Sequence, residues 1–213
     1  MNYSFERPME IHLFRHGETD FNKNRRIQGQ SDSVLTPEGI EQAKQLSQRI
    51  GTLEYDKVFC STSVRTRETA EHAFASRQDI VYLDSLREIY LGAWEGEYYA
   101  EIEKREPISF DHFWNRPDLF NCSGKVGNAE TFAQLQTRAM DTIAQIRSEY
   151  PGQRIAIVSH GALLKAFLCY IERRELKNLW NPPHMHNCAH SIVKFTTDGL
   201  GLITQYADQK TNL

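Results

Sequence analysis

The chain has 213 residues, of which 40% are hydrophobic and 25% charged, as in an ordinary water-soluble globular protein with a substantial core. A formal net charge of −3 argues against a general nucleic-acid-binding protein, which would usually be basic. No apolar run approaches the roughly 20 residues of a membrane-spanning helix, and the N-terminus lacks the apolar core of a signal peptide. We therefore expect neither a nucleic-acid nor a membrane partner.

The first predicted element is a strand that ends in a turn carrying an arginine and a histidine. Ile11 and Leu13 have the spacing of a strand, and Gly17 marks its end. Ligands of open α/β sheets bind just beyond the carboxyl ends of strands. Arg15 supplies a planar guanidinium that matches phosphate oxygens. His16 is either a second phosphate contact or a nucleophile toward phosphorus, and these two residues alone do not decide between the roles.

The next segment, 20–35, is polar and has no helical or strand period, so we expect a long loop near this turn. Its Asn22, Arg25, Arg26 and Gln28 carry donors that could reach an anion. Solvent exposure is an equally good explanation for each of them.

Helices and strands alternate along the rest of the chain. Thr36 and Pro37 occupy favoured positions at the start of a helix that ends at Gly51. Further helices are expected over about 63–76, 98–105, 108–115, 130–149 and 162–171, with a helical turn at 175–180. Strands are expected over 57–61, 80–83, 154–161, 191–197 and 200–206, the last two joined by a hairpin at Asp198 and Gly199.

This alternation predicts an α/β fold with a mainly parallel sheet and an antiparallel edge strand. No interdomain linker or internal repeat interrupts it, so we expect one domain over 1–213. The segment 89–129 is irregular and rich in aromatic residues, and we expect a small cap subregion over one end of the sheet. Most of its aromatic side chains are expected to serve packing.

The four cysteines, at positions 60, 122, 169 and 188, show no CxxC spacing. Cys60 and Cys169 fall in apolar, periodic segments where buried free thiols are expected. This pattern favours a reducing compartment, and we expect a cytoplasmic protein.

Basic residues follow three of the predicted strands. Arg15 and His16 follow the first strand, Arg65 lies in the first turn of the helix after 57–61, and His160 ends the strand within 154–161. Because parallel strands end at the same edge, these side chains can converge on one dianion, most simply a phosphate. Each also has an ordinary explanation: Arg65 could be an exposed helix residue, and His160 could bond to backbone.

Several motifs occur in a fixed order: RHGET followed by Asn22, then Gln28 and Gly29, LTPEG, SxxxRTRETA, LREIxxGxWEG and VSHG. Together they resemble the histidine phosphatase superfamily in its phosphoglycerate mutase-like branch, and the resemblance covers nearly the whole chain. It implies a three-layer α/β/α sandwich and an enzyme that needs no metal or other cofactor.

The resemblance also implies roles by position. His16 matches the histidine that is phosphorylated, and Glu88 matches the proton donor. The positions matched to phosphate binding are Arg15, Asn22, Gln28, Arg65, His160 and Gly161.

Elementary chemistry is consistent with these roles. The His16 imidazole must be neutral to attack phosphorus, so its other nitrogen is expected to donate to backbone near Gly17. Arg15, Arg65 and a protonated His160 would offset the charge on the transferred phosphoryl group.

Two local alternatives remain. Glu88 could be an exposed carboxylate paired with Arg87, and Glu95 is a second candidate for the acid. Among His184, His186, Cys188 and His190 a zinc site is conceivable, but the spacing is poor. Asn187 and the histidines beside it are instead expected near the pocket.

The predicted function is hydrolysis of small phosphorylated metabolites through a phosphohistidine. A phosphoglycerate mutase and a non-catalytic module that binds phosphorylated ligands are the alternatives. The segment 89–129 is shorter than the insertion that mutases usually carry, so the resemblance argues against a mutase. The particular metabolite, the oligomeric state and any movement of the cap are not specified by the sequence.

Overall fold

A mixed sheet of seven strands forms the centre of the protein in the computed structural model, which describes residues 8–75, 77–120 and 128–211. The strands are β1 (Met9–Arg15), β2 (Lys57–Ser61), β3 (Val81–Leu83), β4 (Arg154–Ser159), β5 (His190–Phe195), β6 (Gly201–Tyr206) and β7 (Gln209–Lys210). Their order is β3-β2-β4-β1-β5-β6-β7. The first four are parallel and the last three antiparallel, so the antiparallel edge holds more than the one strand predicted.

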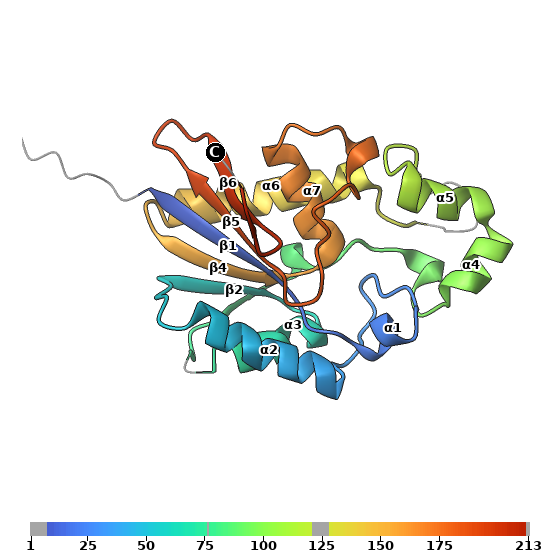
Figure 1. Ribbon diagram of the computed structural model, residues 1–213. Helices are drawn as coiled ribbons and strands as arrows, with labels where there is room; N and C mark the ends of the chain where they lie inside the picture. Colours follow the sequence, from blue (N-terminus) through green and yellow to red (C-terminus); the bar gives the residue numbers. More distant parts are fainter. Residues whose placement is uncertain (1–7, 76, 121–127, 212–213) are drawn as a thin grey trace, which may run out of the picture.

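Helices cover both faces of this sheet. The helices are α1 (Asp20–Lys23), α2 (Pro37–Ile50), α3 (Val64–Ala73), α4 (Tyr99–Arg105), α5 (Pro107–Asn115), α6 (Phe132–Glu149) and α7 (Gly161–Ile171), with short 3-10 turns at Asp84–Leu86, Gly92–Trp94 and Leu176–Asn178. In Figure 1, α2 and α3 lie on one face, and α6 and α7 lie on the other. The predicted three-layer α/β/α sandwich is confirmed.

Strand periodicity explains the two layers of core. Successive side chains of a strand point to opposite faces, so Ile11 and Leu13 pack into the cluster that includes α6 and α7. Phe14 points the other way, into the cluster formed with α2 and α3. Both clusters are buried, which ties each helix layer to β1 and its neighbours.

The strand register brings the ends of β1 and β4 together. Arg15 pairs with Ser159, and the backbone N–H of His16 donates to the Ser159 carbonyl at 3.1 Å. The short helices α1, α4 and α5 lie beyond this edge of the sheet (Figure 1). A ligand at the strand ends is therefore walled by these segments.

The cap contains α4 and α5, close to the two helices predicted there, while 121–127 and Cys122 lie outside the described residues. Trp94, Phe113 and Phe120 are buried and pack on one another, as expected for most aromatic side chains of this segment.

Two details differ from or extend the predictions. The segment expected to be a loop contains α1, which Thr19 and Asn22 initiate through a reciprocal capping box. The hairpin between β5 and β6 is confirmed, with Gly199 at φ 86°, a conformation that favours glycine. The single-domain assignment over 1–213 stays a prediction.

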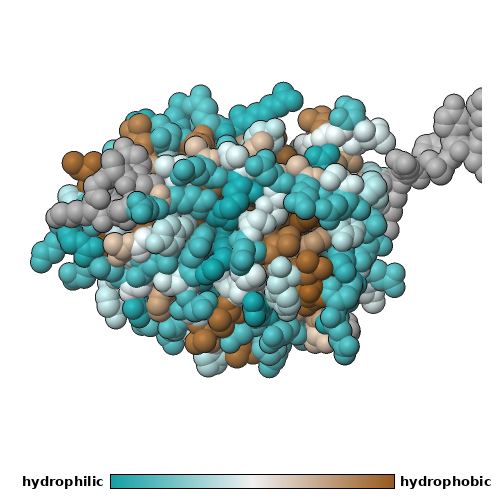
Figure 2. All heavy atoms as spheres, turned by 180° about the vertical axis from the view of Figure 1, so that it is seen from behind, coloured by the Kyte–Doolittle hydropathy of each residue, from teal (hydrophilic) through white to brown (hydrophobic). Residues whose placement is uncertain are grey.

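The face opposite to the view of Figure 1 is mostly polar. From behind, hydrophilic residues cover most of the visible face, and apolar side chains lie in separate groups (Figure 2). In the described ranges of the chain, no helix is both long and apolar enough to cross a membrane.

Candidate active site

The turn after β1 is held from several sides. The carbonyl of His16 accepts from the backbone N–H of Cys188 at 3.1 Å and from the Asn187 side-chain amide at 3.2 Å. The N–H of Gly17 donates to the Thr69 hydroxyl on α3 at 3.0 Å. The backbone that presents His16 is therefore fixed by α3 and by the loop before β5.

The His16 ring is buried, with one nitrogen bound to backbone. Its Nδ1 lies 2.7 Å from the carbonyl of Gly17, which makes Nδ1 the protonated nitrogen and leaves the Nε2 lone pair as the nucleophilic position. This is the backbone partner expected from the sequence. Burial first, and then Arg65 and Arg15, lower the pKa of His16 well below its ordinary value. The ring is therefore neutral at physiological pH.

Arg65, which is buried, and Arg15, which is half-buried, lie beside it, and each is anchored by only part of its guanidinium. Arg65 has no exposed surface, and its Nη1 and Nη2 donate to the carbonyls of Ser31 and Gly29 at 2.9 and 2.7 Å. Arg15 Nη1 donates to the Met185 carbonyl at 2.5 Å. The Nε atoms of both arginines lack a partner among the described residues.

His160 lies behind His16, with 5.4 Å between the ring centroids. Its Nε2 is 2.8 Å from the Ser61 hydroxyl, and its Nδ1 has no partner within the described ranges. Burial and the nearby Arg65 lower the pKa of His160 well below its ordinary value. In the ligand-free protein a protonated His160 is therefore disfavoured, because it would be a second buried cation beside Arg65. A protonated His160 beside a bound phosphoryl group stays a prediction.

Two amide side chains use their oxygens structurally. The Asn22 Oδ1 accepts from the backbone N–H of Thr19 and from Asn187, both at 3.2 Å. The Gln28 Oε1 accepts from the hydroxyls of Thr19 and Ser33 at 2.8 and 2.7 Å. Both residues line the cavity described below, so their NH₂ groups are the donors left to meet a ligand.

Glu88 sits at the N-terminus of α7. Its two oxygens accept from the backbone N–H groups of Ile89, Ala162 and Leu163, each at 3.0 Å. Arg87 instead donates to a backbone carbonyl of the neighbouring loop, so the alternative of a Glu88–Arg87 pair is wrong. A helix N-terminus stabilises a carboxylate and fixes its position.

Glu95, the second candidate acid, has a structural place. It accepts from the backbone N–H groups of Gln30 and Leu91 and from the Ser31 hydroxyl. It also lies against Gly29, where an added Cβ would come within 2.3 Å of the Glu95 Oε1. Glu95 therefore joins two loops and is not among the residues that line the cavity.

These side chains border a cavity of about 250 Å³. Every predicted site residue except His160 lines it. Gly161 lies against Arg15, whose Nε would be 3.4 Å from a Cβ at position 161. The remaining lining residues come mainly from the cap and from the segment 180–185, and they are Ile27, Gly29, Ile89, Leu91, Tyr99, Phe113, Trp114, Ala162, Lys165, Trp180, His184 and Met185.

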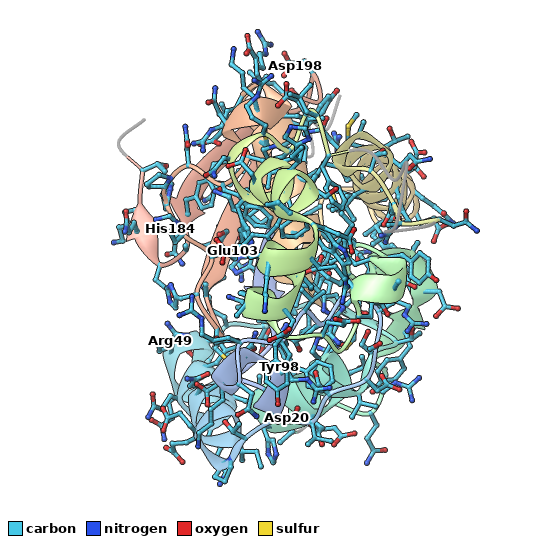
Figure 3. All side chains as sticks on the ribbon, turned by 90° about the vertical axis from the view of Figure 1, so that its right-hand side faces the viewer. Asp20, Arg49, Tyr98, Glu103, His184 and Asp198 are labelled. Carbon is cyan, nitrogen blue, oxygen red and sulfur yellow. The ribbon has the colours of Figure 1, made fainter. Side chains whose placement is uncertain are left out.

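Figure 3 looks onto this end of the molecule. Helix α4, with Glu103 and the preceding Tyr98, lies in front, and His184 lies to the side of it. The sequence reasoning did not assign Tyr99, Trp114 or Trp180 to the site. The signal for Tyr99 and Trp114 is the aromatic content of the cap, which predicts packing, whereas Trp180 lies outside 89–129 and has no such signal.

The residues considered for zinc have separate contacts. His184 lines the cavity, His186 lies 2.9 Å from Asp208, His190 contacts His12 at 3.0 Å, and Cys188 is buried. Within the described part of the chain, no three His, Cys, Asp or Glu side chains are placed to hold a metal ion.

Two of the loop donors lie away from the cavity. Arg25 is exposed, and Arg26 donates to the Gly96 carbonyl and stacks on Phe21. Arg67 on α3 is exposed.

A comparison with known families matches residues 11–208 to the histidine phosphatase superfamily (branch 1). The chain belongs to this superfamily, and the predicted enzyme class, a phosphatase, is confirmed at that level.

Known relatives agree with this assignment. A metal-independent phosphoserine phosphatase of Arabidopsis thaliana is 33% identical over 162 residues, which cover 74% of this chain and 66% of that protein. A probable phosphoglycerate mutase, GpmB, of Enterobacter sp. (strain 638) is 34% identical over 197 residues, or 88% of this chain and 85% of that one. Among solved structures, YhfR of Bacillus stearothermophilus matches with a TM-score of 0.89 at 36% identity, covering 94% of this chain and 97% of that one.

Proposed function

We propose that the protein hydrolyses phosphate monoesters of small metabolites through a phosphohistidine on His16 and without a metal ion. One observation carries this proposal. The neutral His16 presents Nε2 beside two buried donors that lack partners among the described residues, the Nε atoms of Arg15 and Arg65. Such donors suit phosphate oxygens, which can accept from both.

The first half-reaction forms a bond between His16 Nε2 and phosphorus and breaks the bond from phosphorus to the ester oxygen. Glu88 gives its proton to that oxygen, and the alcohol departs. In this structure both Glu88 oxygens accept from backbone, so the role requires one of them to exchange that contact for the substrate. Arg15 and Arg65 stabilise the charge on the transferred group.

The second half-reaction reverses the direction of proton transfer. Glu88, now a carboxylate, takes a proton from water as the water oxygen attacks phosphorus. The bond from His16 Nε2 to phosphorus breaks, and inorganic phosphate leaves with the imidazole neutral again. The Arabidopsis relative, named as a metal-independent phosphatase, supports this metal-free route.

The test is a panel of phosphorylated metabolites assayed with and without EDTA, with His16→Ala and a control, His72→Ala, on the outer part of α3. We expect rates that survive chelation, a loss of at least ~10³-fold in His16→Ala and little change in the control. Brief reaction with a phosphorus-labelled substrate should leave an acid-labile label on the wild type only. An inactive wild type that still binds phosphate would favour the non-catalytic module.

A phosphoglycerate mutase is the second candidate, because the Enterobacter relative carries that name. A mutase would interconvert 2- and 3-phosphoglycerate and depend on a bisphosphoglycerate primer. Hydrolysis without primer, and no isomer exchange when primer is present, would exclude this candidate.

A further inference from the structure

The cavity has two chemically different halves. One half holds His16, the two arginines and Glu88, and the other is walled by aromatic and aliphatic side chains. The first half accounts for the phosphoryl group. The second half would contact the alcohol part of the ester, so its lining residues determine the substrate preference.

The apolar half is built from rings that support one another. Trp114 lies 5.3 Å from Trp180 and 4.8 Å from Phe113, measured between ring centroids. The indole N–H of Trp180 donates to the Phe113 carbonyl at 2.6 Å, so its polar atom is already engaged. Leu91 and Met185, both buried, add aliphatic surface. These walls offer contact area to a ligand and few polar groups.

The lysine in this half, Lys165, already donates to backbone carbonyls. Lys165 is 2% exposed, and its ammonium donates to the carbonyls of Asn181 and Pro183 at 2.6 and 3.1 Å. It also faces the ring of Tyr206, 5.0 Å from the centroid. Among the described residues that line the cavity, a carboxylate on the alcohol part would therefore meet no free lysine or arginine beyond Arg15 and Arg65, which the phosphoryl group occupies. The polar groups left to it include the amides of Asn22 and Gln28 and the ring of His184.

We propose that the preferred substrates are phosphate esters of uncharged, ring-bearing alcohols, and that Trp114 and Trp180 select them. This inference rests on the proposed phosphatase function and narrows its substrate class. Burial of an aromatic ring against such walls is favourable, whereas a carboxylate would lose its hydration without a lysine or arginine partner and would also approach Glu88.

The test compares esters of primary alcohols, because a shared leaving-group type removes differences in intrinsic reactivity. The compounds are 2-phenylethyl phosphate, O-phosphoserine and 3-phosphoglycerate. We expect kcat/KM to be roughly 10- to 100-fold higher for 2-phenylethyl phosphate, the factor that burial of one ring provides. Equal or higher values for the two carboxylates would overturn the inference.

Variants of Trp114 test whether this residue produces the substrate preference. Trp114→Ala should lower kcat/KM for 2-phenylethyl phosphate about tenfold, and Trp114→Phe should retain most of it. Trp114→Arg supplies a cation and should reverse the preference toward the carboxylates, which a merely structural role for Trp114 would not produce. Tyr170→Ala is the matched control, because Tyr170 is an exposed aromatic residue on α7 outside the cavity. An unchanged preference in Trp114→Arg would contradict the assignment.

A binding measurement separates failure of the inference from failure of the proposed function. The phosphonates 3-phenylpropylphosphonate and 2-amino-4-phosphonobutanoate correspond to the first two esters and cannot be hydrolysed. Tighter binding of the phenyl compound supports the inference even if no ester is turned over, which would refute the phosphatase proposal alone. Tighter binding of the amino acid analogue, together with hydrolysis that depends on His16, would overturn the inference and leave the phosphatase proposal standing.

Discussion

Arg65 and His160 are both fully buried, and each has a nitrogen without a hydrogen-bond partner in the described ranges. A buried polar atom in that state costs about 1–3 kcal/mol. Proteins keep few such atoms, and each requires an explanation. A phosphate oxygen would provide the missing acceptor for the Nε of Arg65, so the stability lost there in the free protein would be recovered on binding.

The acid role of Glu88 predicts a dependence on the leaving group. Glu88→Gln should lower kcat for alkyl phosphates by roughly 10²- to 10⁴-fold, the usual contribution of a positioned acid. Turnover of 4-nitrophenyl phosphate should fall much less, because nitrophenolate leaves without a proton. Steady-state rates on both esters check this.

Glu95→Gln is the control for that comparison. Glu95 joins two loops through backbone and hydroxyl donors, so its loss should affect both esters alike. If Glu88→Gln also slowed both esters equally, the assignment of the acid would be wrong.

At the scale of elements, β1 and β5 bring two buried histidines together. Nδ1 of His12 lies 3.0 Å from Nε2 of His190, and the Tyr55 hydroxyl lies 3.1 Å from the same His12 nitrogen. Burial lowers the pKa of His12 to about 4 and that of His190 to about 3. Glu10, 3.6 Å from His12, has its pKa lowered to about 2 despite burial, through its bonds to Lys194 and Arg154.

This pair predicts acid sensitivity of the fold. Below pH ~6.5 the unfolded chain protonates both histidines while the folded protein does not, so the free energy of unfolding should fall as the pH drops from 6.5 toward 4. Each histidine contributes about 1.4 kcal/mol per pH unit in that window. Above pH 6.5 the effect vanishes, because both states carry neutral rings.

Urea unfolding at a series of pH values measures this slope. His190→Asn should make it shallower, whereas His72→Asn, at a partly exposed position of α3, should leave it almost unchanged. A slope that is the same in His190→Asn and the wild type would refute the explanation.

Helix α2 touches the turn after β1 through close backbone contacts at Gly39, and its Gln42 side chain also accepts from the Glu18 N–H at 2.9 Å. A Cβ at Gly39, in the first turn of α2, would lie 2.0 Å from the Glu18 carbonyl oxygen, and a Cβ at Gly17 would lie 2.5 Å from the Gly39 carbonyl oxygen. Gly39→Ala must therefore push α2 away from the turn that presents His16. We expect a stability loss of roughly 1–3 kcal/mol together with a fall in kcat.

The control for that variant is Ala43→Gly, one turn further along α2. It should cost about 1–2 kcal/mol, through helix propensity and the loss of a buried methyl group, and leave kcat nearly unchanged. Thermal unfolding and steady-state kinetics of both variants check the pair. Wild-type kcat in Gly39→Ala would show that this contact does not position His16.

Across the whole molecule, the sequence was informative where the structure depends on neighbours in the chain. Strand ends followed by Arg15 and His160 have a local signature, and parallel pairing brings them together. The aromatic side of the cavity has no local signature in the sequence. Trp114 and Trp180 meet only after the cap packs against a segment more than 60 residues later. The neutral state of His160 likewise results from complete burial beside Arg65, which no local pattern records.

Arg15 and Arg65 each reach backbone with one part of the guanidinium and leave Nε for a ligand. The orthophosphate set free by hydrolysis offers these nitrogens the same oxygens that the ester offered. Contacts that tighten the binding of the ester therefore also slow the release of orthophosphate. We therefore expect orthophosphate to compete with the ester for the cavity, so that turnover slows as the product accumulates.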